Sequence, residues 1–406
     1  MDQLAVNQYD IPERSSKLAV FDAQLSKYIP EYISRWSCTR IVLVASKGLY
    51  TAHNHIQDLE TLLGSKIVAK KIGVGEHSPY ADVIAIAHML QEYNADCLVS
   101  IGSSSYSDAS KIAALLAATL PSGFTAKDME SLVDQRKGHG TCQAAKVKVI
   151  LVPTSLSASE WNGSSSCTNP DGKKQHFSPP GGHRVAVADL ILLDPELAST
   201  APERLWLSSG VRCMDHCVET ICNPHCTPPA SADAQEGLAA MLKGLLEYKQ
   251  GEGADRARYL RGISDSQQGA RRAIMALIVH RNSFGPSHAI GHQLGSVSGV
   301  MHGITSCILL APVLKYQARD PSRREAQATV LKVFNETLGW RETEAADAVT
   351  KFVKLLGLRT RLEEVGVTDE GELERIAAKT LTDVWGGGVA QITEAGEVMK
   401  ILDLAR

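Results

Sequence analysis

Residues 97–111, CLVSIGSSSYSDASK, hold the combination of elements that decides the fold. The apolar run CLVSI predicts a buried strand, Gly102 and the serines after it predict a tight turn, and a helix is predicted to open near Ser107 and to run through Lys111. A strand, a small-residue turn and a helix N-terminus present backbone N–H groups and a positive dipole end to an anion. A pyrophosphate group needs this chemistry. The alternative is an ordinary strand-to-helix turn with Ser107 or Asp108 as its N-cap.

Short β-branched runs alternate with helical patterns on both sides of this stretch. The runs are RIVLVA at 40–45, KIVAKKI at 66–72, VKVILV at 147–152 and VAVADLILLD ending at 194, and amphipathic helices are predicted over about 78–93 and 108–120. Such alternation is typical of an α/β layer with a largely parallel sheet. The segment over 163–182 is interpreted as an excursion from this layer.

A second small-residue segment follows the predicted strand that ends at Val152. It contains Thr154, Ser155 and Ser159. Because the carboxyl ends of parallel strands share one edge of a sheet, this segment and the Gly102–Ser105 turn can converge on one ligand. Two hydroxyl-rich loops at one edge favour a nucleotide site.

From residue 202 onward the strand signal disappears, and the chain shows successive helical patterns broken by Pro/Gly turns. The segment DPELASTAPE, near 194–201, separates the two compositions. We therefore expect an α/β domain over residues 1–198 and an all-α domain over residues 199–406.

Histidines in the predicted helical domain carry the sharpest chemical signal. His288 and His292 are four residues apart and share a helix face, and His302 begins another helix after a glycine-rich connection. Arg212 and His216 show the same spacing upstream. We expect these five side chains to line one cavity.

Imidazoles at this spacing suit two kinds of site. They could hold a divalent metal that polarises a carbonyl or alcohol oxygen, or they could hydrogen-bond that oxygen without a metal. No carboxylate stands at metal-ligand spacing: Asp215 points about 100 degrees away from His216 around the helix, and Glu219 is the only acid on the same face. The cysteines at 213, 217, 222 and 226 lack zinc-knuckle spacing and are interpreted as structural thiols.

The composition excludes several other classes of protein. The 406 residues are 44% hydrophobic and 21% charged, and the formal net charge of -3 offers no general attraction to nucleic acid or anionic lipid. The N-terminal segment mixes charged and polar residues where a secretory signal needs an apolar stretch, and no apolar run is long enough for a membrane span. Nine cysteines suit free thiols in a reducing compartment. We expect a cytoplasmic protein that acts on a small molecule.

Together these motifs resemble those of the iron-type alcohol dehydrogenase superfamily. Its G-G-G-S-x-x-D-x-x-K coenzyme motif is similar to residues 102–111, its P-T-T-x-G-T-G-S-E segment is similar to 153–160, and its D-P-E-L stretch is present at 194–197. The H-x-x-x-H-x-L-G motif at 288–295, with H-G at 302–303, is the most specific match.

The resemblance implies a dehydroquinate synthase-like architecture, with a Rossmann-like coenzyme domain, an all-helical metal or substrate domain, and a homodimer. It also implies that a set of small-residue positions binds NADPH or NADH. These positions are Ser46, Lys47, Gly102, Ser103, Ser104, Ser105, Asp108, Thr154, Ser155 and Ser159.

Departures from the family pattern affect both the metal and the coenzyme. The resemblance implies metal ligation by His216, His288 and His302, but Arg212 stands where metal-dependent members carry an aspartate ligand. A guanidinium there would repel Fe²⁺ or Zn²⁺, and the S-G-V-R-x-M-D-H wording is similar to the maleylacetate reductase-like branch. We therefore expect an altered or absent metal site.

The coenzyme loop departs from the family pattern at Ser103 and Ser104, which replace glycines and restrict close approach of a pyrophosphate. Ser46 and Lys47 stand where NAD-specific relatives carry an acid, which favours NADPH or dual use.

These observations predict NAD(P)H-dependent reduction of a carbonyl, or the reverse oxidation of an alcohol, on a small substrate that can bear a carboxylate. Arg212 would anchor the substrate, and His216, His288 and His302 would line the oxygen site. The resemblance implies that His292 relays the proton. The alternative is a non-redox enzyme on the same scaffold, such as an isomerase, dehydratase or cyclase, with a degenerate coenzyme loop.

Overall fold

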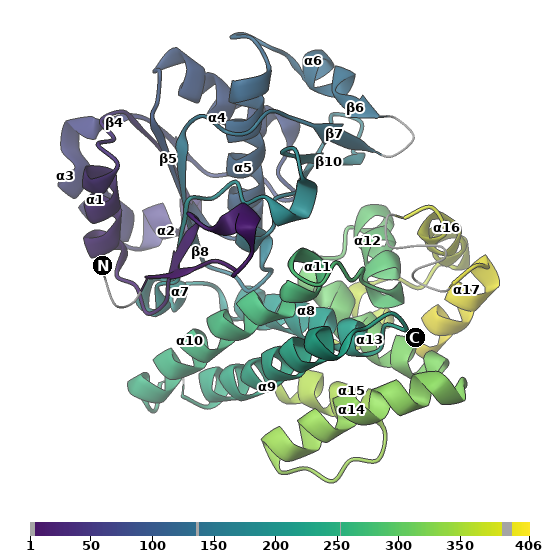
Figure 1. Ribbon diagram of the computed structural model, residues 1–406. Helices are drawn as coiled ribbons and strands as arrows, with labels where there is room; N and C mark the ends of the chain where they lie inside the picture. The colour runs from purple at the N-terminus through teal and green to yellow at the C-terminus, as the bar shows by residue number, and fades with distance from the viewer. Residues whose placement is uncertain (1–4, 135–137, 252, 384–391) are drawn as a thin grey trace. The chain divides into compact units, whose positions relative to one another are not determined.

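The computed structural model describes residues 5–134, 138–251, 253–383 and 392–406. The chain divides into two compact units, residues 1–201 and 202–406. Figure 1 shows strands with flanking helices in the first unit and helices in the second.

The first unit contains a seven-stranded sheet in the order β1-β2-β11-β8-β5-β3-β4. Apart from the antiparallel pair β1/β2, neighbouring strands are parallel. The strands are β1 (Ala5–Asn7), β2 (Leu18–Val20), β3 (Ile41–Ala45), β4 (Ile67–Ile72), β5 (Cys97–Gly102), β8 (Lys148–Pro153) and β11 (Leu190–Leu192). A smaller sheet has the order β6-β7-β10-β9, from β6 (Val133–Asp134), β7 (His139–Thr141), β9 (Ser165–Thr168) and β10 (Lys174–Ser178).

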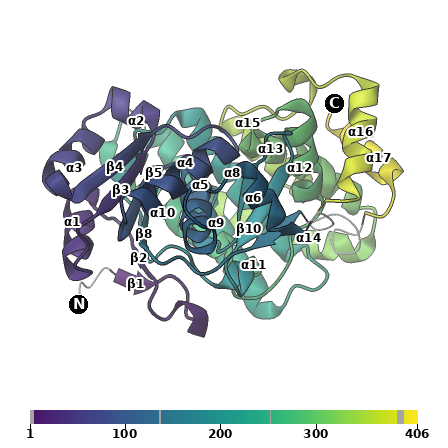
Figure 2. The ribbon, with the colours of Figure 1, turned by 90° about the horizontal axis from the view of Figure 1, so that it is seen from above.

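Helices cover both faces of the larger sheet. The apolar side chains of α1 and α3 share a core with those of β3, β5, β8 and β11, whereas α4 and α5 contact the other face, as Figure 2 shows. The helices of this unit are α1 (Leu25–Arg35), α2 (Lys47–Ala52), α3 (His55–Leu63), α4 (Tyr80–Glu92), α5 (Ser104–Thr119), α6 (Ala126–Ser131) and α7 (Pro195–Ala198). The predicted α/β class with a largely parallel sheet is confirmed.

The predicted strands at 40–45, 66–72, 97–101 and 147–152 agree with β3, β4, β5 and β8 to within one residue at each end. The predicted start of the helix after β5 was wrong. Helix α5 begins at Ser104 with Ser103 as its N-cap, so Ser104 and Ser105 belong to its first turn. Strands β1 and β2 were not predicted, and the excursion over 163–182 contributes β9 and β10.

A buried arginine attaches the N-terminal segment to this unit. Arg14 is fully buried and donates to the backbone carbonyls of Trp161, His183 and Arg184, at 2.6, 2.8 and 2.7 Å. It also donates to the side chain of Gln8. Backbone carbonyls are the main partners that offset the desolvation of this guanidinium.

Asp194 gives the D-P-E-L stretch a structural role. One carboxylate oxygen accepts from the Leu197 amide at the start of α7, and the other accepts from the Leu25 amide at the start of α1, at 3.0 and 2.9 Å. A single buried carboxylate therefore caps two helix N-termini, where acids are favoured.

The described elements of the second unit are helices. They are α8 (Glu203–Ile221), α9 (Pro228–Gly251), α10 (Arg256–Ala273), α11 (Met275–Ile278), α12 (Pro286–Ser298), α13 (His302–Gln317), α14 (Pro321–Leu338), α15 (Ala345–Leu355), α16 (Glu370–Thr380) and α17 (Ala395–Leu404). The expected free thiols are confirmed, because the nine cysteines form no disulfide.

Glycines at seven-residue spacing bring α9 and α10 into close backbone contact. A Cβ at Gly244 would lie 2.5 Å from Ser266 Oγ, and a Cβ at Gly262 would lie 2.4 Å from the Tyr248 nitrogen. Figure 1 shows the two long helices side by side. Because the neighbours of Gly262 are backbone atoms, they cannot rotate away from a larger residue.

We expect Gly262→Ala to lower the free energy of unfolding by about 1–3 kcal/mol or more, because α9 and α10 must separate to admit the methyl group. Gly396→Ala is the matched control, since Gly396 lies in α17 with no atom within 4 Å of its added Cβ. The control should be neutral or stabilise by about 0.5–1 kcal/mol. Denaturant unfolding of both variants checks this, and equal effects would contradict the close-packing explanation.

Candidate active site

Two groups of predicted site residues lie in different units, and the first group gathers at one edge of the larger sheet. The strand order reverses between β3 and β5, so the carboxyl ends of these strands flank a topological switch point. The Ser46 amide donates to the Ile101 carbonyl at 2.9 Å. Lys47 begins α2, and its amide donates to the hydroxyl of Tyr106 at 3.4 Å.

Gly102 is the residue that the turn requires. Its φ is 159°, and a Cβ there would lie 2.6 Å from the ring of Tyr106. The chain then enters α5, whose 16 residues direct the positive end of their dipole toward the turn. The turn and helix N-terminus therefore keep the form of an anion site despite Ser103 and Ser104.

The two predicted small-residue loops meet, as expected. The Thr154 amide donates to the Gly102 carbonyl at 2.9 Å, and the Ser104 amide donates to Ser155 Oγ at 3.2 Å. With these two amides engaged, the other first-turn amides of α5 and the hydroxyls at the switch point form a donor set that fits the pyrophosphate of a dinucleotide.

Asp108 and Lys111 connect α5 to the second loop. Asp108 accepts from Ser159 Oγ at 2.5 Å, and the fully buried Lys111 ammonium donates to the carbonyls of Ser159 and Asn162 at 2.5 and 2.9 Å. The aspartate and the lysine of the coenzyme motif therefore hold the second small-residue loop in place through these hydrogen bonds. The coenzyme contacts of Asp108 and Ser159 stay a prediction.

Glu160 lies beside this group and is 4% exposed. Burial raises its pKa to about 7, although its own backbone amide and the charge of Lys111 oppose the rise. The protonated carboxyl is therefore favoured in the folded chain below neutral pH.

The second group of predicted residues gathers in the second unit. Arg212 and His216 lie on α8, His288 and His292 lie on α12, and His302 begins α13. Burial lowers the pKa of His288 well below its ordinary value, and the other four residues lower it further, Arg212 first. The structure therefore places all five residues close enough to interact electrostatically.

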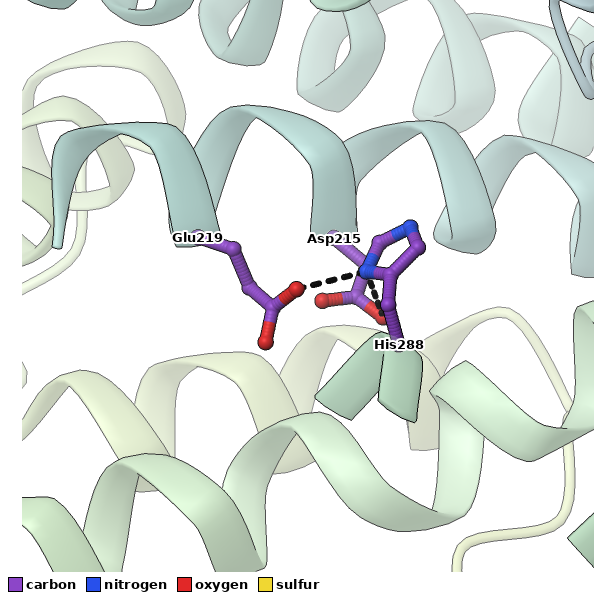
Figure 3. A group of neighbouring side chains, drawn as sticks. All are labelled: Asp215, Glu219 and His288. Carbon is purple, nitrogen blue, oxygen red and sulfur yellow. Dashed lines mark hydrogen bonds and ion pairs between the residues drawn. The ribbon is translucent and has the colours of Figure 1, made fainter. Parts of the chain in front are cut away.

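Glu219, on α8, joins α8 to the start of α12. Its carboxylate accepts from the backbone amides of Gly285 and Ser287 at 2.7 and 2.6 Å and from His288 Nδ1 at 2.6 Å. Figure 3 shows Glu219 and Asp215 pointing from α8 toward the His288 ring. A Cβ at Gly285 would lie 2.9 Å from Glu219 Oε1, which favours glycine there.

Asp215 connects this pair to Arg212. Its Oδ2 accepts from Ser287 Oγ at 2.7 Å and from Ser306 Oγ at 2.6 Å, and Arg212 Nη1 donates to Ser306 Oγ at 3.2 Å. Burial raises the pKa of Asp215 to about 6, whereas Arg212 and the two serines oppose the rise. The buried charges of Arg212 and Asp215 are thus linked through a hydroxyl.

Arg212 is 3% exposed, yet it forms no ion pair with any described carboxylate. Its Nη2 lies 3.5 Å from His292 Nε2. Burial lowers the pKa of Arg212, and Asp215, Glu219 and Asp383 act in the opposite direction. A buried guanidinium without a direct counterion is costly unless another anion completes the site.

The imidazole rings form two stacked pairs. His216 stacks on His288 with centroids 4.7 Å apart, and Phe284 stacks on both at 4.5 Å. His292 stacks on His302 at 5.3 Å. His216 Nδ1 and His288 Nε2 are buried polar atoms without a hydrogen-bond partner in the structure. An oxygen of a ligand, or a cation, could be the partner of each of these two nitrogens.

The metal ligands implied by the resemblance do not fit this arrangement. Imidazole lone pairs lie in the ring plane, so the nearly parallel rings of His216 and His288, 28° apart, do not direct nitrogens at one point. The Arg212 guanidinium adds a like charge. A different triad, Asp215, Glu219 and His288, offers ligand atoms within 4.8 Å of one another and could hold a cation. His288 Nδ1, Glu219 and Asp215 Oδ2 are already engaged in hydrogen bonds, whereas Asp215 Oδ1 is buried without a partner in the structure.

The expectation that no carboxylate stands near the histidines at metal-ligand spacing was wrong, because Asp215, Glu219 and His288 offer ligand atoms within 4.8 Å of one another. Helix α12 packs against the face of α8 that carries Asp215 and Glu219, so His288 Nδ1 lies 2.6 Å from Glu219 and 3.6 Å from Asp215. The i,i+4 spacing of these acids on a helix without other acids in its buried part was the available signal. Asp383, which contacts His292, had no local signal.

Two family models match successive parts of the chain. Residues 17–195 match the model described as iron-containing alcohol dehydrogenase, and residues 206–405 match the C-terminal model of the Fe-containing alcohol dehydrogenase family. The chain belongs to the iron-containing alcohol dehydrogenase family and is an oxidoreductase. Among the described residues, no helix is both long and apolar enough to cross a membrane.

Curated relatives include dehydrogenases and reductases. Dehydrogenase FUM7 of Gibberella moniliformis is 31% identical over 85% of this chain and 85% of its own. Dehydrogenase ALT3 of Alternaria alternata is 31% identical over 90% of this chain and 98% of its own. Maleylacetate reductase 1 of Rhodococcus opacus is 25% identical over 85% of each chain. The resemblance to the maleylacetate reductase-like branch is confirmed.

Solved structures share the fold. Maleylacetate reductase from Agrobacterium tumefaciens has a TM-score of 0.72 and 20% identity, covering 95% of each chain. Sulfoacetaldehyde reductase from Bifidobacterium kashiwanohense, in complex with NAD⁺, has a TM-score of 0.78 and 17% identity, covering 95% of this chain and 96% of its own. The predicted architecture is confirmed.

Glu160 gives the first unit a pH-dependent stability. Since its folded pKa of about 7 exceeds the ordinary 4.5, its contribution is fully present below about pH 4.5 and is lost as pH rises through 7. The loss amounts to roughly 3 kcal/mol. Glu160→Gln imitates the protonated form, so its melting temperature relative to the unmodified protein should rise between pH 4.5 and 8.

Melting curves of both proteins across this range check the expectation. Glu31→Gln is the control, because Glu31 pairs with Arg35 at the surface and exposed ion pairs contribute little. A Glu160→Gln difference that is constant with pH would contradict burial of the charged form.

Proposed function

We propose that the protein reduces a carbonyl of a small, carboxylate-bearing substrate with NAD(P)H, or catalyses the reverse reaction, and that it needs no metal. The observation that carries the proposal is the buried Arg212 guanidinium, which has no ion-pair partner among the described residues and lies in one polar network with His288. A planar guanidinium matches a carboxylate in a two-pronged hydrogen bond.

His288 is positioned to hydrogen-bond the reacting oxygen. Its Nδ1 is held by Glu219, and its Nε2 is the buried atom that lacks a partner. A substrate alcohol or carbonyl oxygen would be the hydrogen-bond partner that His288 Nε2 lacks. His288 Nε2 would exchange a proton with that oxygen, while Glu219 accepts or returns the proton shared with Nδ1. The second unpartnered nitrogen, on His216, lies in the ring stacked on His288.

The coenzyme would be held at the switch point of the first unit. When bound, NAD(P)H supplies the hydride. The Gly102 turn and the first turn of α5 would receive its phosphates, and the hydroxyls of Thr154 and Ser155 lie beside them. Ser46 and Lys47 provide no carboxylate against a 2′-phosphate, which favours NADPH or use of both coenzymes. No observation favours the non-redox alternative.

The substrate class is tested with oxo acids and their methyl esters, such as 4-oxobutanoate and methyl 4-oxobutanoate, with NADH and NADPH. We expect the acid to be preferred, and Arg212→Gln to lower kcat/KM for the acid by about 10- to 100-fold while changing the ester less than about threefold. Coenzyme oxidation measured by absorbance checks this.

Arg204→Gln is the matched control, because Arg204 lies exposed on the same helix. It should leave both substrates unchanged. Equal losses for acid and ester in Arg212→Gln would show that Arg212 does not read a carboxylate, and no turnover of any carbonyl with either coenzyme would contradict the proposed reaction.

Metal content is a separate expectation. A divalent cation about 4 Å from Arg212 would meet a repulsion of several kcal/mol. The purified protein should therefore contain well under one Fe²⁺ or Zn²⁺ per chain and keep its activity in EDTA. Arg212→Asp should raise metal occupancy, because it removes the like charge near Asp215, Glu219 and His288 and adds a carboxylate. Elemental analysis decides between these outcomes, and one tightly held metal per unmodified chain would contradict the metal-free site.

A further inference from the structure

We infer that Asp383 is a positioning residue that fixes the ring of His292 and, through it, the orientation of the Arg212 guanidinium. Asp383 follows α16 by three residues, whereas His292 lies in α12. Sequence spacing therefore gives no reason to associate them. The structure brings Asp383, from the C-terminal part of the chain, into contact with His292. Glu219 contacts a different histidine, His288.

The contacts of Asp383 are specific. Both of its carboxylate oxygens lie 3.2 Å from His292 Nδ1, and Oδ2 also accepts from Gln293 Nε2 at 2.8 Å. The side chains of Asp383 and His292 are 8% and 10% exposed. At this burial the contact is little screened by water.

The chemistry of the three groups fixes the direction of each hydrogen bond. A carboxylate only accepts, so His292 Nδ1 carries the proton in this contact. In a neutral ring His292 Nε2 is then an acceptor, and a guanidinium only donates. Arg212 Nη2, 3.5 Å away, therefore donates to Nε2. Asp383 thereby determines which His292 nitrogen faces Arg212.

Two restraints hold Arg212 from different sides. Nη1 donates to Ser306 Oγ, which Asp215 holds, and Nη2 faces His292, which Asp383 holds. Because the guanidinium is planar, these two contacts fix its orientation and therefore the direction in which its remaining N–H groups point. Each restraint ends on a carboxylate, and neither carboxylate touches the guanidinium directly.

This arrangement makes Asp383 a determinant of specificity rather than of folding alone. Without it, His292 can adopt the other tautomer, whose Nε2–H opposes a guanidinium N–H. Arg212 would then lose one of its two restraints. Substrates that bind through the guanidinium would then be turned over less efficiently. This part of the inference rests on the proposed function.

The test compares Asp383→Ala with Gln293→Ala. Both remove an attachment between the segment after α16 and α12, but only the first removes the partner of His292. We expect Asp383→Ala to lower kcat/KM for 4-oxobutanoate on the order of 10- to 100-fold and that for its methyl ester less than about threefold. Gln293→Ala should leave both values within about threefold.

A spectroscopic measurement tests the ring without relying on turnover. In ¹⁵N-histidine-labelled protein, with the His292 signals assigned through His292→Gln, Nδ1 should be the protonated nitrogen. Asp383→Ala should shift the tautomer toward Nε2–H, and Gln293→Ala should not. If Asp383→Ala does not fold, Asp383→Leu supplies the same comparison, because it also removes the acceptor for His292 Nδ1 while filling the space of the side chain.

The outcomes separate the inference from the proposed function. Equal losses for acid and ester in Asp383→Ala, or an unchanged His292 tautomer, would overturn the positioning role and leave Asp383 as a tether like Gln293. If the unmodified protein does not prefer the acid, the proposed substrate class fails, and the tautomer measurement alone still decides whether Asp383 holds the ring.

Discussion

The carboxylate of Glu219 is the contact on which the helical unit's site depends. Three donors meet on it: two backbone amides at the beginning of α12 and the Nδ1 of His288. The amides at a helix start have no partner within their own helix, so a buried acid from α8 satisfies them. The same contact decides how α12 docks on α8 and which nitrogen of His288 remains available. The Glu219 side chain therefore contributes both to helix packing and to the orientation of His288.

From this contact a continuous polar network extends through the second unit. Asp215 lies one helical turn before Glu219 and reaches Ser287 and Ser306, and Ser306 reaches Arg212. Polar groups buried at this depth are tolerated only when their neighbours satisfy them. Gly291 permits the close approach of α12, since a Cβ there would lie 2.9 Å from Thr305 Oγ1 and 3.4 Å from Arg212 Nη1. The glycines among the histidines thus serve helix packing, and the histidines serve the site.

Local sequence patterns predicted the parallel strands, the turn at Gly102 and the five clustered side chains, because periodicity and short spacing determine these features directly. Strands β1 and β2 were not predicted because each has only three residues, and β2 joins the parallel part of the sheet through β11, which lies far away in sequence. The start of α5 was misplaced because serines suit both a turn and a first helical turn. The i,i+4 spacing of Asp215 and Glu219 does not identify their partners, which lie on α12 about 70 residues away, and Asp383 lies about 90 residues from His292 with no local signal at all.

The attachment of the N-terminal segment has a consequence for the order of folding during synthesis. Arg14 must find carbonyls up to 170 residues ahead of it, and β2 completes its parallel pairing only with β11. Both partners leave the ribosome near the end of the first unit, so β2 and Arg14 lack their long-range partners until almost the whole α/β layer has emerged. Closure across so long a separation is entropically slow. The segment that carries β2 and Arg14 is then among the last parts of its unit to become ordered.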